Sequence, residues 1–155
     1  MSLVIRPESF GATVYDTKSL AYWFVDHAGR EKWLGEPGAI LRESPRPLPT
    51  HTLAGPIRTY FEITTRCNAR CRYCLNAAGA PRARQLTTTE ILRCIEQMGV
   101  DGVMEVRLNG GEPTIHPDFL EIGGAVKLNG MTLSVNSNLL IDGALRKLIE
   151  LRPTL

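Results

Sequence analysis

The sequence has no long apolar run, few aromatic residues and almost no excess of charge of either sign. No stretch of its 155 residues reaches the roughly 18 uninterrupted apolar residues of a membrane span, so we expect no membrane association. Charges near the N-terminus also argue against a signal peptide. With 18 basic and 16 acidic residues, the formal net charge is +2, so no bulk field attracts nucleic acid. At 43% apolar, the composition is that of a globular protein, which we expect in the cytoplasm.

Cysteine is scarce too, and its distribution is uneven. Of four cysteines, Cys67, Cys71 and Cys74 fall within eight residues, whereas Cys94 lies in an expected helix. A disulfide framework would be spread over a secreted domain, so this clustering argues against one. Clustered thiols in a reducing compartment indicate a metal ion or an iron–sulfur cluster instead. We expect Cys94 to pack in the core, since a free cysteine behaves as a small hydrophobe.

The first 56 residues divide into an expected β-hairpin element (residues 1–34) and a connector (residues 35–56). Residues 11–16 and 20–26 are rich in β-branched and aromatic residues and predict two strands. Residues 27–30 predict a turn, and Glu31–Leu34 is a further strand candidate. Such an element buries too little area to be stable alone, so we expect it to dock on the rest. The connector contains five prolines and three glycines, which exclude a helix or an inner strand.

Residues 57–155 alternate between strand and helix patterns. The strongest helix pattern begins with a capping box of Thr87 and Glu90; Pro117 is expected to open a second helix and Asp142 to cap a third. This alternation favours parallel strands joined by right-handed crossovers. Three such units leave an open sheet edge, so we expect a longer chain or a partner to supply the missing half. The expected strands are 60–65, 103–108 and 131–135, and the expected helices are 87–98, 117–129 and 142–151.

The three clustered cysteines follow the first of these strands with the spacing C-x3-C-x2-C. Thiolates at this spacing can each reach a different iron of a cuboidal [4Fe–4S] cluster, which leaves one iron without a protein ligand. By analogy with open catalytic metal sites, a small molecule would bind there. Two other interpretations stay open, namely three unliganded thiols or a structural zinc ion. The fourth zinc ligand would be His51, Cys94 or His116.

The cysteine loop, with Tyr73 before its last cysteine, resembles the hallmark of the radical SAM superfamily. A second family motif, Gly110-Gly111-Glu112, follows the second strand. Ser137-Asn138 after the third strand is similar to another, although Leu139 stands where a glycine is more common. The resemblance covers residues 58–155. It implies an α/β fold in which residues 57–155 form the first half of a partial (β/α)6 TIM-like barrel.

The resemblance also implies cofactors and an activity. The three clustered cysteines would hold a [4Fe–4S] cluster, and S-adenosylmethionine (SAM) would chelate its open iron with the adenine near Tyr73. The Gly-Gly-Glu edge would bind the amino group of the methionine moiety, and Ser137 and Asn138 would line the same site. The implied reaction is reductive cleavage of SAM to a 5′-deoxyadenosyl radical. A flavodoxin or a ferredoxin would donate the electron.

Charged residues surround the cysteine loop. Their positive charge would favour the reduced cluster, although some of them are expected to be merely solvated. We interpret His116 as a helix-entry residue, because Pro117 fixes a helix start beside it. The arginines concerned are Arg66, Arg70, Arg72, Arg82 and Arg84.

The segment Ile5–Gly11 is similar to the start of some radical SAM peptide maturases of the SPASM type. There, a β-rich element captures a leader peptide, and an exposed strand edge can do so by β-augmentation. A precursor peptide is therefore an expected partner. The recognition element of those enzymes continues into helices, for which the connector leaves no room. The alternatives are a hairpin that only packs on the barrel, an enzyme acting on a small molecule, and a non-catalytic zinc module.

Overall fold

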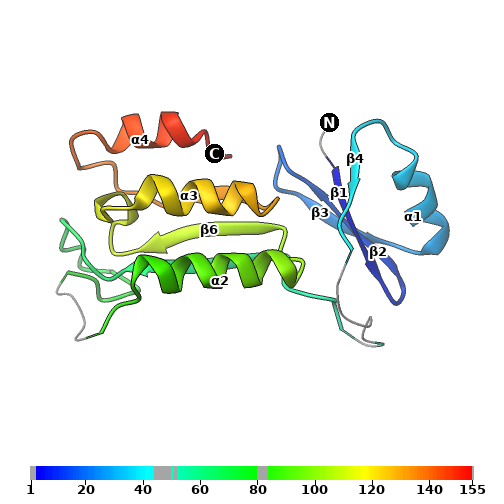
Figure 1. Cartoon of the computed structure of the whole chain (residues 1–155), viewed down its shortest axis with the longest axis horizontal. Coiled ribbons are helices and arrows are strands. Elements are labelled where there is room, and N and C mark those ends of the chain that lie inside the picture. Colours follow the sequence, from blue (N-terminus) through cyan, green and yellow to red (C-terminus); the bar gives the residue numbers. More distant parts are fainter. Residues whose placement is uncertain (1–2, 44–49, 51, 80–83, 155) are drawn as a thin grey trace.

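The computed structural model describes residues 3–43, 50, 52–79 and 84–154, which form two sheets (Figure 1). The N-terminal unit (residues 3–43) contains a four-stranded sheet in the order β3-β2-β1-β4. β1, β2 and β3 are antiparallel neighbours, whereas β4 pairs with β1 in parallel. The predicted hairpin is confirmed as β2 and β3. The bounds are β1 Leu3–Glu8, β2 Gly11–Asp16, β3 Tyr22–Val25, α1 His27–Leu34 and β4 Ala39–Leu41.

The prediction of a turn at 27–30 followed by a strand at Glu31–Leu34 is wrong, because residues 27–34 form helix α1. Asp26 caps this helix, and its side chain accepts a hydrogen bond of 2.8 Å from Gly29 N. Trp33 on the helix packs edge-on against Trp23 of β3, with ring centroids 5.2 Å apart. The helix lies within the predicted β-hairpin element and ends before the connector. β4 lies within the expected connector, at the edge of the sheet, and residues 44–49 and 51 lie outside the described residues.

The second sheet has three parallel strands in the order β5-β6-β7, as the alternating pattern predicts. Helices α2, α3 and α4 pack on one face of it, and the hydrophobic core lies between these layers. The largest fully buried side chains of this core include Phe119, Ile91 and Leu108. The bounds are β5 Arg58–Thr64, α2 Thr88–Val100, β6 Glu105–Gly110, the 3-10 turn η1 Pro113–Ile115, α3 Phe119–Leu128, β7 Thr132–Val135 and α4 Ala144–Leu151.

The helix starts agree with the sequence only in part. The capping box of Thr87 and Glu90 is confirmed at the start of α2. Helix α3 begins at Phe119 rather than at Pro117, and Asp118 makes no side-chain cap because its carboxylate accepts a hydrogen bond from Thr88 Oγ1. The predicted cap of α4 is wrong as well. Gly143 in a left-handed conformation occupies that position, and no side chain caps the helix.

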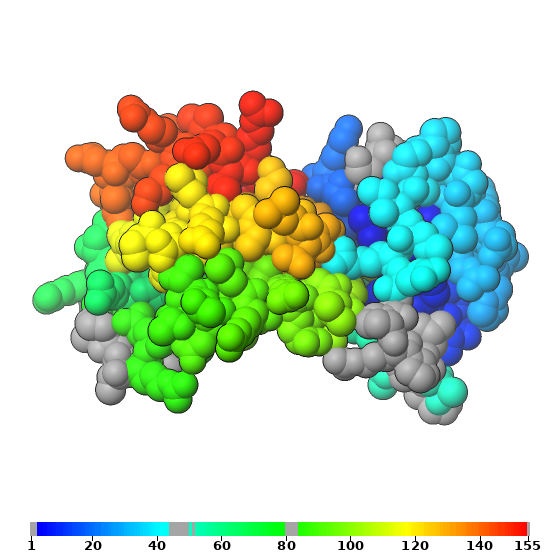
Figure 2. Space-filling view, viewed as in Figure 1, coloured from blue at the N-terminus to red at the C-terminus, as the bar shows by residue number. Residues whose placement is uncertain are grey.

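The N-terminal unit docks on the end of the parallel sheet where β6 and β7 begin (Figures 1 and 2). Arg42, just after β4, donates to the carbonyl oxygens of Gly130 at 2.7 Å and of Gly99 and Asn129 at 3.1 Å. On the other side of the junction, Tyr15 OH donates to the carboxylate of Glu105, the first residue of β6, at 3.1 Å. The expectation that this piece docks on the rest of the chain is therefore confirmed.

Replacing Arg42 by alanine should lower the free energy of unfolding by about 2 kcal/mol, since three carbonyl oxygens lose a charged donor. Urea denaturation followed by tryptophan fluorescence measures this, because both tryptophans, Trp23 and Trp33, lie in the N-terminal unit. Arg30→Ala is the matched control, since Arg30 only pairs with Glu31 at the surface and should contribute less than ~1 kcal/mol. Equal stabilities for the two variants would contradict the docking role of Arg42.

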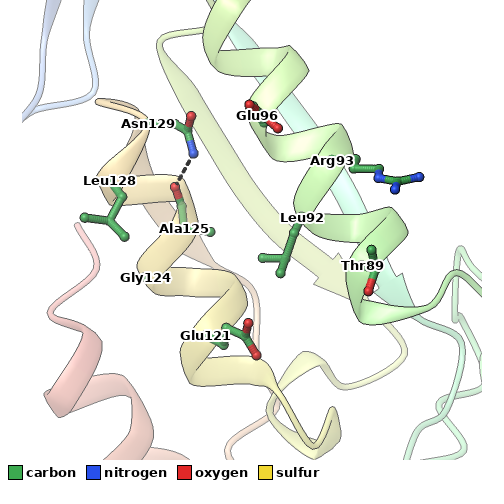
Figure 3. Close-up of a pocket in the computed structure, with 9 residues that line it drawn as sticks. All are labelled: Thr89, Leu92, Arg93, Glu96, Glu121, Gly124, Ala125, Leu128 and Asn129. Atoms are coloured by element: carbon green, nitrogen blue, oxygen red, sulfur yellow. Dashed lines mark hydrogen bonds between the residues drawn. The ribbon is translucent and has the colours of Figure 1, made fainter.

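The outer side of the helical layer carries a groove of about 610 Å³ between α2 and α3 (Figure 3). None of the three sequence motifs contributes to it. Arg93 of α2 is among the residues that line it, and Leu128 of α3 is 89% exposed. Within the described part of the chain, no helix has both the length and the apolar character to span a membrane.

Candidate functional site

The three sequence motifs follow the carboxyl ends of three neighbouring parallel strands. The cysteine loop follows β5, the Gly-Gly-Glu motif ends β6, and Ser137-Asn138 follows β7. Parallel strands present their carboxyl ends at one edge of the sheet, where the sites of such folds are built. In Figure 1 this edge is the one to which the arrow of β6 points, opposite the N-terminal unit.

The glycine pair brings its backbone directly against the start of the cysteine loop. Gly111 N donates to Thr64 O at 2.8 Å, and Glu112 N donates to Arg66 O at 2.9 Å. Gly110 has a φ of 143°, a conformation that other residues rarely adopt. A Cβ on Gly111 would lie 2.1 Å from Arg66 O and 3.0 Å from Cys67 Cβ. Glycine is therefore required at this contact by steric fit.

Glu112 links the end of β6 to the loop after β7. Its side chain is completely buried, and Oε1 accepts hydrogen bonds from Thr114 N at 3.0 Å, Thr114 Oγ1 at 2.6 Å and Ser137 Oγ at 2.9 Å. Its Oε2 accepts from Asn138 N at 2.7 Å. The structure thus brings Glu112, Ser137 and Asn138 together. With four donors around it, the carboxylate orders this edge.

Replacing Glu112 by glutamine should cost about 1–3 kcal/mol of folding stability, because a buried amide nitrogen would face hydrogen-bond donors. Glu121→Gln, on the exposed side of α3, changes the same charge without a buried partner and should stay within about 0.5 kcal/mol of the wild type. Chemical denaturation of the two variants in parallel makes the comparison. A Glu112→Gln protein as stable as Glu121→Gln would refute this ordering role.

The cysteine loop is irregular and largely open to solvent. Cys67 is half-buried, whereas Cys71 and Cys74 are exposed. Two backbone N–H groups point at sulfur: Ala69 N lies 3.4 Å from Cys67 Sγ, and Ala78 N lies 3.4 Å from Cys74 Sγ. Such bonds stabilise thiolates and influence the potential of a bound cluster. The loop borders a hollow of about 530 Å³ lined by Cys67, Asn68, Arg70, Ala78 and Gly79.

Two asparagines that the sequence analysis did not single out tie the loop to the other motifs. Asn76 Nδ2 donates to Gly110 O at 3.0 Å. Asn68 Oδ1 accepts from Asn138 Nδ2 at 2.9 Å, and the same nitrogen lies 3.9 Å from Cys67 Sγ. Their position within the cysteine loop was the only available signal. Tyr73 stands apart from these contacts, with its side chain 91% exposed.

Cys94 and His116 make none of the contacts just described. Cys94 on α2 is half-buried, so it is less enclosed than a core residue. Burial lowers the pKa of His116, a shift that neighbouring Asp118 opposes, and its Nδ1 accepts from Asp118 N at 3.1 Å. His51 lies outside the described residues. Within the described ranges, no three His, Cys, Asp or Glu side chains come together around one metal ion.

The three motifs follow one another along the chain and converge at one sheet edge. A comparison with known protein families agrees with this arrangement. The profile of the Radical SAM superfamily matches residues 61–155, which is more than half of the chain. This chain belongs to the radical SAM superfamily. The resemblance inferred from the sequence is therefore confirmed, and the matched residues begin in β5 and include all three motifs.

Curated relatives support this membership over short lengths. Molybdenum cofactor biosynthesis protein 1 of Drosophila melanogaster is 45% identical over 78 residues, which are 47% of this chain and 14% of that protein. PqqA peptide cyclase of Methylorubrum extorquens is 37% identical over 109 residues, 68% of this chain and 27% of that protein. The chain thus spans about a quarter or less of the length of these relatives.

A solved structure resembles the whole fold. Streptococcus suis SuiB bound to precursor peptide SuiA superposes with a TM-score of 0.71 at 15% identity, covering 97% of this chain and 44% of SuiB. SuiB bound to S-adenosylmethionine gives a TM-score of 0.69 at 14% identity over 95% of this chain and 44% of that one. The likeness includes the N-terminal unit as well as the three β/α units, and at this identity it concerns the fold alone.

Proposed function

We propose that this chain provides the cluster-binding and SAM-binding half of a radical SAM enzyme that modifies a peptide. The observation that carries the proposal is the convergence of the three motifs, with Glu112 hydrogen-bonded to the loop that holds Ser137 and Asn138. In this proposal, the three β/α units form the first half of a partial (β/α)6 barrel. The clustered thiols and the reducing compartment that they favour support a cytoplasmic location.

The residues present fit a [4Fe–4S] cluster and SAM. Cys67, Cys71 and Cys74 would hold the cluster, since three thiols share one open loop and two of their sulfurs already accept backbone hydrogen bonds. When bound, these cofactors supply a 5′-deoxyadenosyl radical that abstracts hydrogen from a substrate. Gly110 and Gly111 would offer backbone atoms to the amino group of SAM, and Tyr73 at the exposed part of the loop would lie near its adenine.

The roles of the surrounding residues follow from their contacts. Glu112 holds the loop after β7 in place and keeps negative charge near the proposed ammonium position. The hydrogen bond from Asn138 to Asn68 fixes that loop against the cysteine loop. The exposure of Cys71 and Cys74 would let an electron donor of the flavodoxin or ferredoxin class approach closely. Arg66, Arg70 and Arg72 would favour a negatively charged donor surface there.

A peptide substrate is supported by the relatives and by the N-terminal unit. One relative is named a peptide cyclase, and the SuiB structure contains a precursor peptide. In the present chain, β3 is an edge strand whose exposed rings, Tyr22 and Phe24, stack edge-on with centroids 5.9 Å apart. A leader peptide could add to this edge by β-augmentation. Phe24→Ser should then weaken the binding of a precursor peptide without changing the iron content.

The second candidate is a radical SAM enzyme acting on a small molecule. The 45% identity to a molybdenum cofactor biosynthesis protein favours it, since that is the highest identity among the relatives described above. Precursor peptide binding separates the two candidates. A precursor peptide that does not bind at all would favour the small-molecule enzyme, whereas unchanged affinity after Phe24→Ser would exclude the β3 edge as the peptide site.

The deciding experiment measures iron, sulfide and zinc after anaerobic reconstitution, with electron paramagnetic resonance of the reduced protein before and after addition of SAM. We expect about four irons per chain and a signal that changes with SAM. Stoichiometric zinc without such a signal would refute the proposal and favour a structural zinc module.

A further inference from the structure

The face of the parallel sheet that points away from the helices is lined by polar side chains. Strand side chains alternate between the two faces, and Ile63, Val106 and Leu133 belong to the core on the helical side. Their neighbours along each strand therefore point to the other side, which we call the inner face. The strand register arranges the inner face in three rows: Arg58, Glu105 and Thr132; Tyr60, Arg107 and Ser134; Glu62 and Asn109.

Arg107 is held rigidly in the middle row. Its Nε donates to Ser134 Oγ at 3.0 Å, its Nη2 to Glu105 Oε1 at 3.1 Å and its Nη1 to Tyr60 OH at 3.3 Å. Its guanidinium carbon lies 5.3 Å from the centroid of the Tyr60 ring. The side chain is 22% exposed. Contacts among the described residues use three of its five N–H groups, so a preorganised guanidinium still has donors to offer.

Two of these rows, Arg58–Glu105–Thr132 and Tyr60–Arg107–Ser134, carry an excess of positive charge, because they hold two arginines and one glutamate. Glu105 is fully buried and accepts from both Arg58 and Arg107, so one carboxylate serves two guanidiniums. Burial opposes its ionisation, but hydrogen bonds from Ser134 and Arg58 outweigh burial and hold the pKa of Glu105 below its usual value. The carboxylate therefore stays charged near neutral pH. Besides Glu105, the inner face carries the carboxylate of Glu62, which is solvent-exposed and lies opposite Asn109.

The geometry points to Arg107 as the residue that anchors a carboxylate group of the substrate on the inner face. Gly110 lies three residue steps after Arg107, about 10 Å along β6 toward the glycine edge. A substrate whose carboxylate binds Arg107 would therefore extend along β6 to the carboxyl end of the sheet. The inference rests on the proposed function and adds a chemical class, a carboxylate-bearing substrate, together with a specificity-determining residue for it.

The test uses the 155-residue chain and two kinds of probe. One is the pair of blocked pentapeptides acetyl-Ala-Ala-Glu-Ala-Ala-amide and its Gln counterpart, and the other is succinate. Binding is measured by the side-chain Nε–Hε resonances of the arginines and by titration calorimetry. We expect the Glu peptide or succinate to bind about tenfold more tightly than the Gln peptide and to shift the Arg107 resonance. A preference for the peptide or for succinate identifies the source of the carboxylate.

Variants keep the inference falsifiable. Arg107→Met should remove the discrimination between the Glu and Gln peptides, and Arg107→Lys should retain part of it because the charge remains but the fork of donors does not. Arg93→Met, on the outer surface, should leave it unchanged. The inference would be overturned if the wild type and Arg107→Lys each bound the Glu peptide, the Gln peptide and succinate with equal affinity. Iron content and SAM binding of the same variants test the proposed function separately, since no cluster ligand is altered.

Discussion

Replacing any one of Cys67, Cys71 and Cys74 by alanine should reduce iron incorporation to background and abolish SAM cleavage. Each thiolate would bind a different iron of the proposed cluster, which would already have one iron without a protein ligand, so losing a second ligand should leave it without adequate support. The folded state should change little, because Cys71 and Cys74 are exposed, Cys67 is half-buried and none of the three forms a disulfide. Iron analysis, anaerobic SAM cleavage and circular dichroism of the three variants measure these effects.

Cys94→Ala is the matched control for this series. Cys94 lies on α2, in a helix whose buried residues face the core, and it takes no part in the loop. The variant should keep full iron content and the wild-type rate of SAM cleavage. An undiminished rate in any of the three loop variants, or a loss of iron in Cys94→Ala, would contradict the assignment of the ligands.

Gly111→Ala should destabilise the protein strongly. Its Cβ would stand 2.1 Å from Arg66 O, and because this obstacle is backbone, the strand end and the cysteine loop must separate. We expect a loss of roughly 3 kcal/mol in stability and a failure to assemble the cluster, since Cys67 follows Arg66 directly. Denaturation curves and iron content after reconstitution check the two effects.

Gly124→Ala adds the same methyl group as Gly111→Ala but should have the opposite effect on stability. Gly124 lies in α3, and no atom lies within 4 Å of the Cβ that alanine would add. Alanine should therefore stabilise the helix by about 1 kcal/mol without affecting iron content. Similar behaviour of the two variants would show that the close approach at Gly111 does not hold the cysteine loop in position.

The parallel part of the fold was predictable because its signals are local. The capping box of Thr87 and Glu90 and the apolar spacing of Ile91 and Ile95 specify α2 without reference to any other segment. The three motifs were predictable in the same way, as short runs after strands. Asn68 and Asn76 escaped notice because an isolated amide in a loop carries no signal until the partner strand ends are placed beside it.

The N-terminal unit was less predictable because its elements depend on distant partners. The pattern of residues 3–8 does not predict a strand, since β1 carries Arg6 and Glu8 in its buried part. These charges form a pair of 2.8 Å, and Thr13 and the backbone of Ala54 also donate to Glu8. A buried ion pair of this kind is stable only when all of its partners are assembled. A prediction based on hydrophobic pattern therefore does not identify β1 as a strand.

The docking of the N-terminal unit at the far end of the parallel strands has a geometric consequence for the proposed peptide substrate. β6 has six residues and spans about 20 Å between the N-terminal sheet and the glycine edge. A precursor held at one end and modified at the other must bridge this distance with six or more extended residues. The fold would therefore act as a ruler, fixing a minimum number of residues between the leader and the first position that the radical can reach.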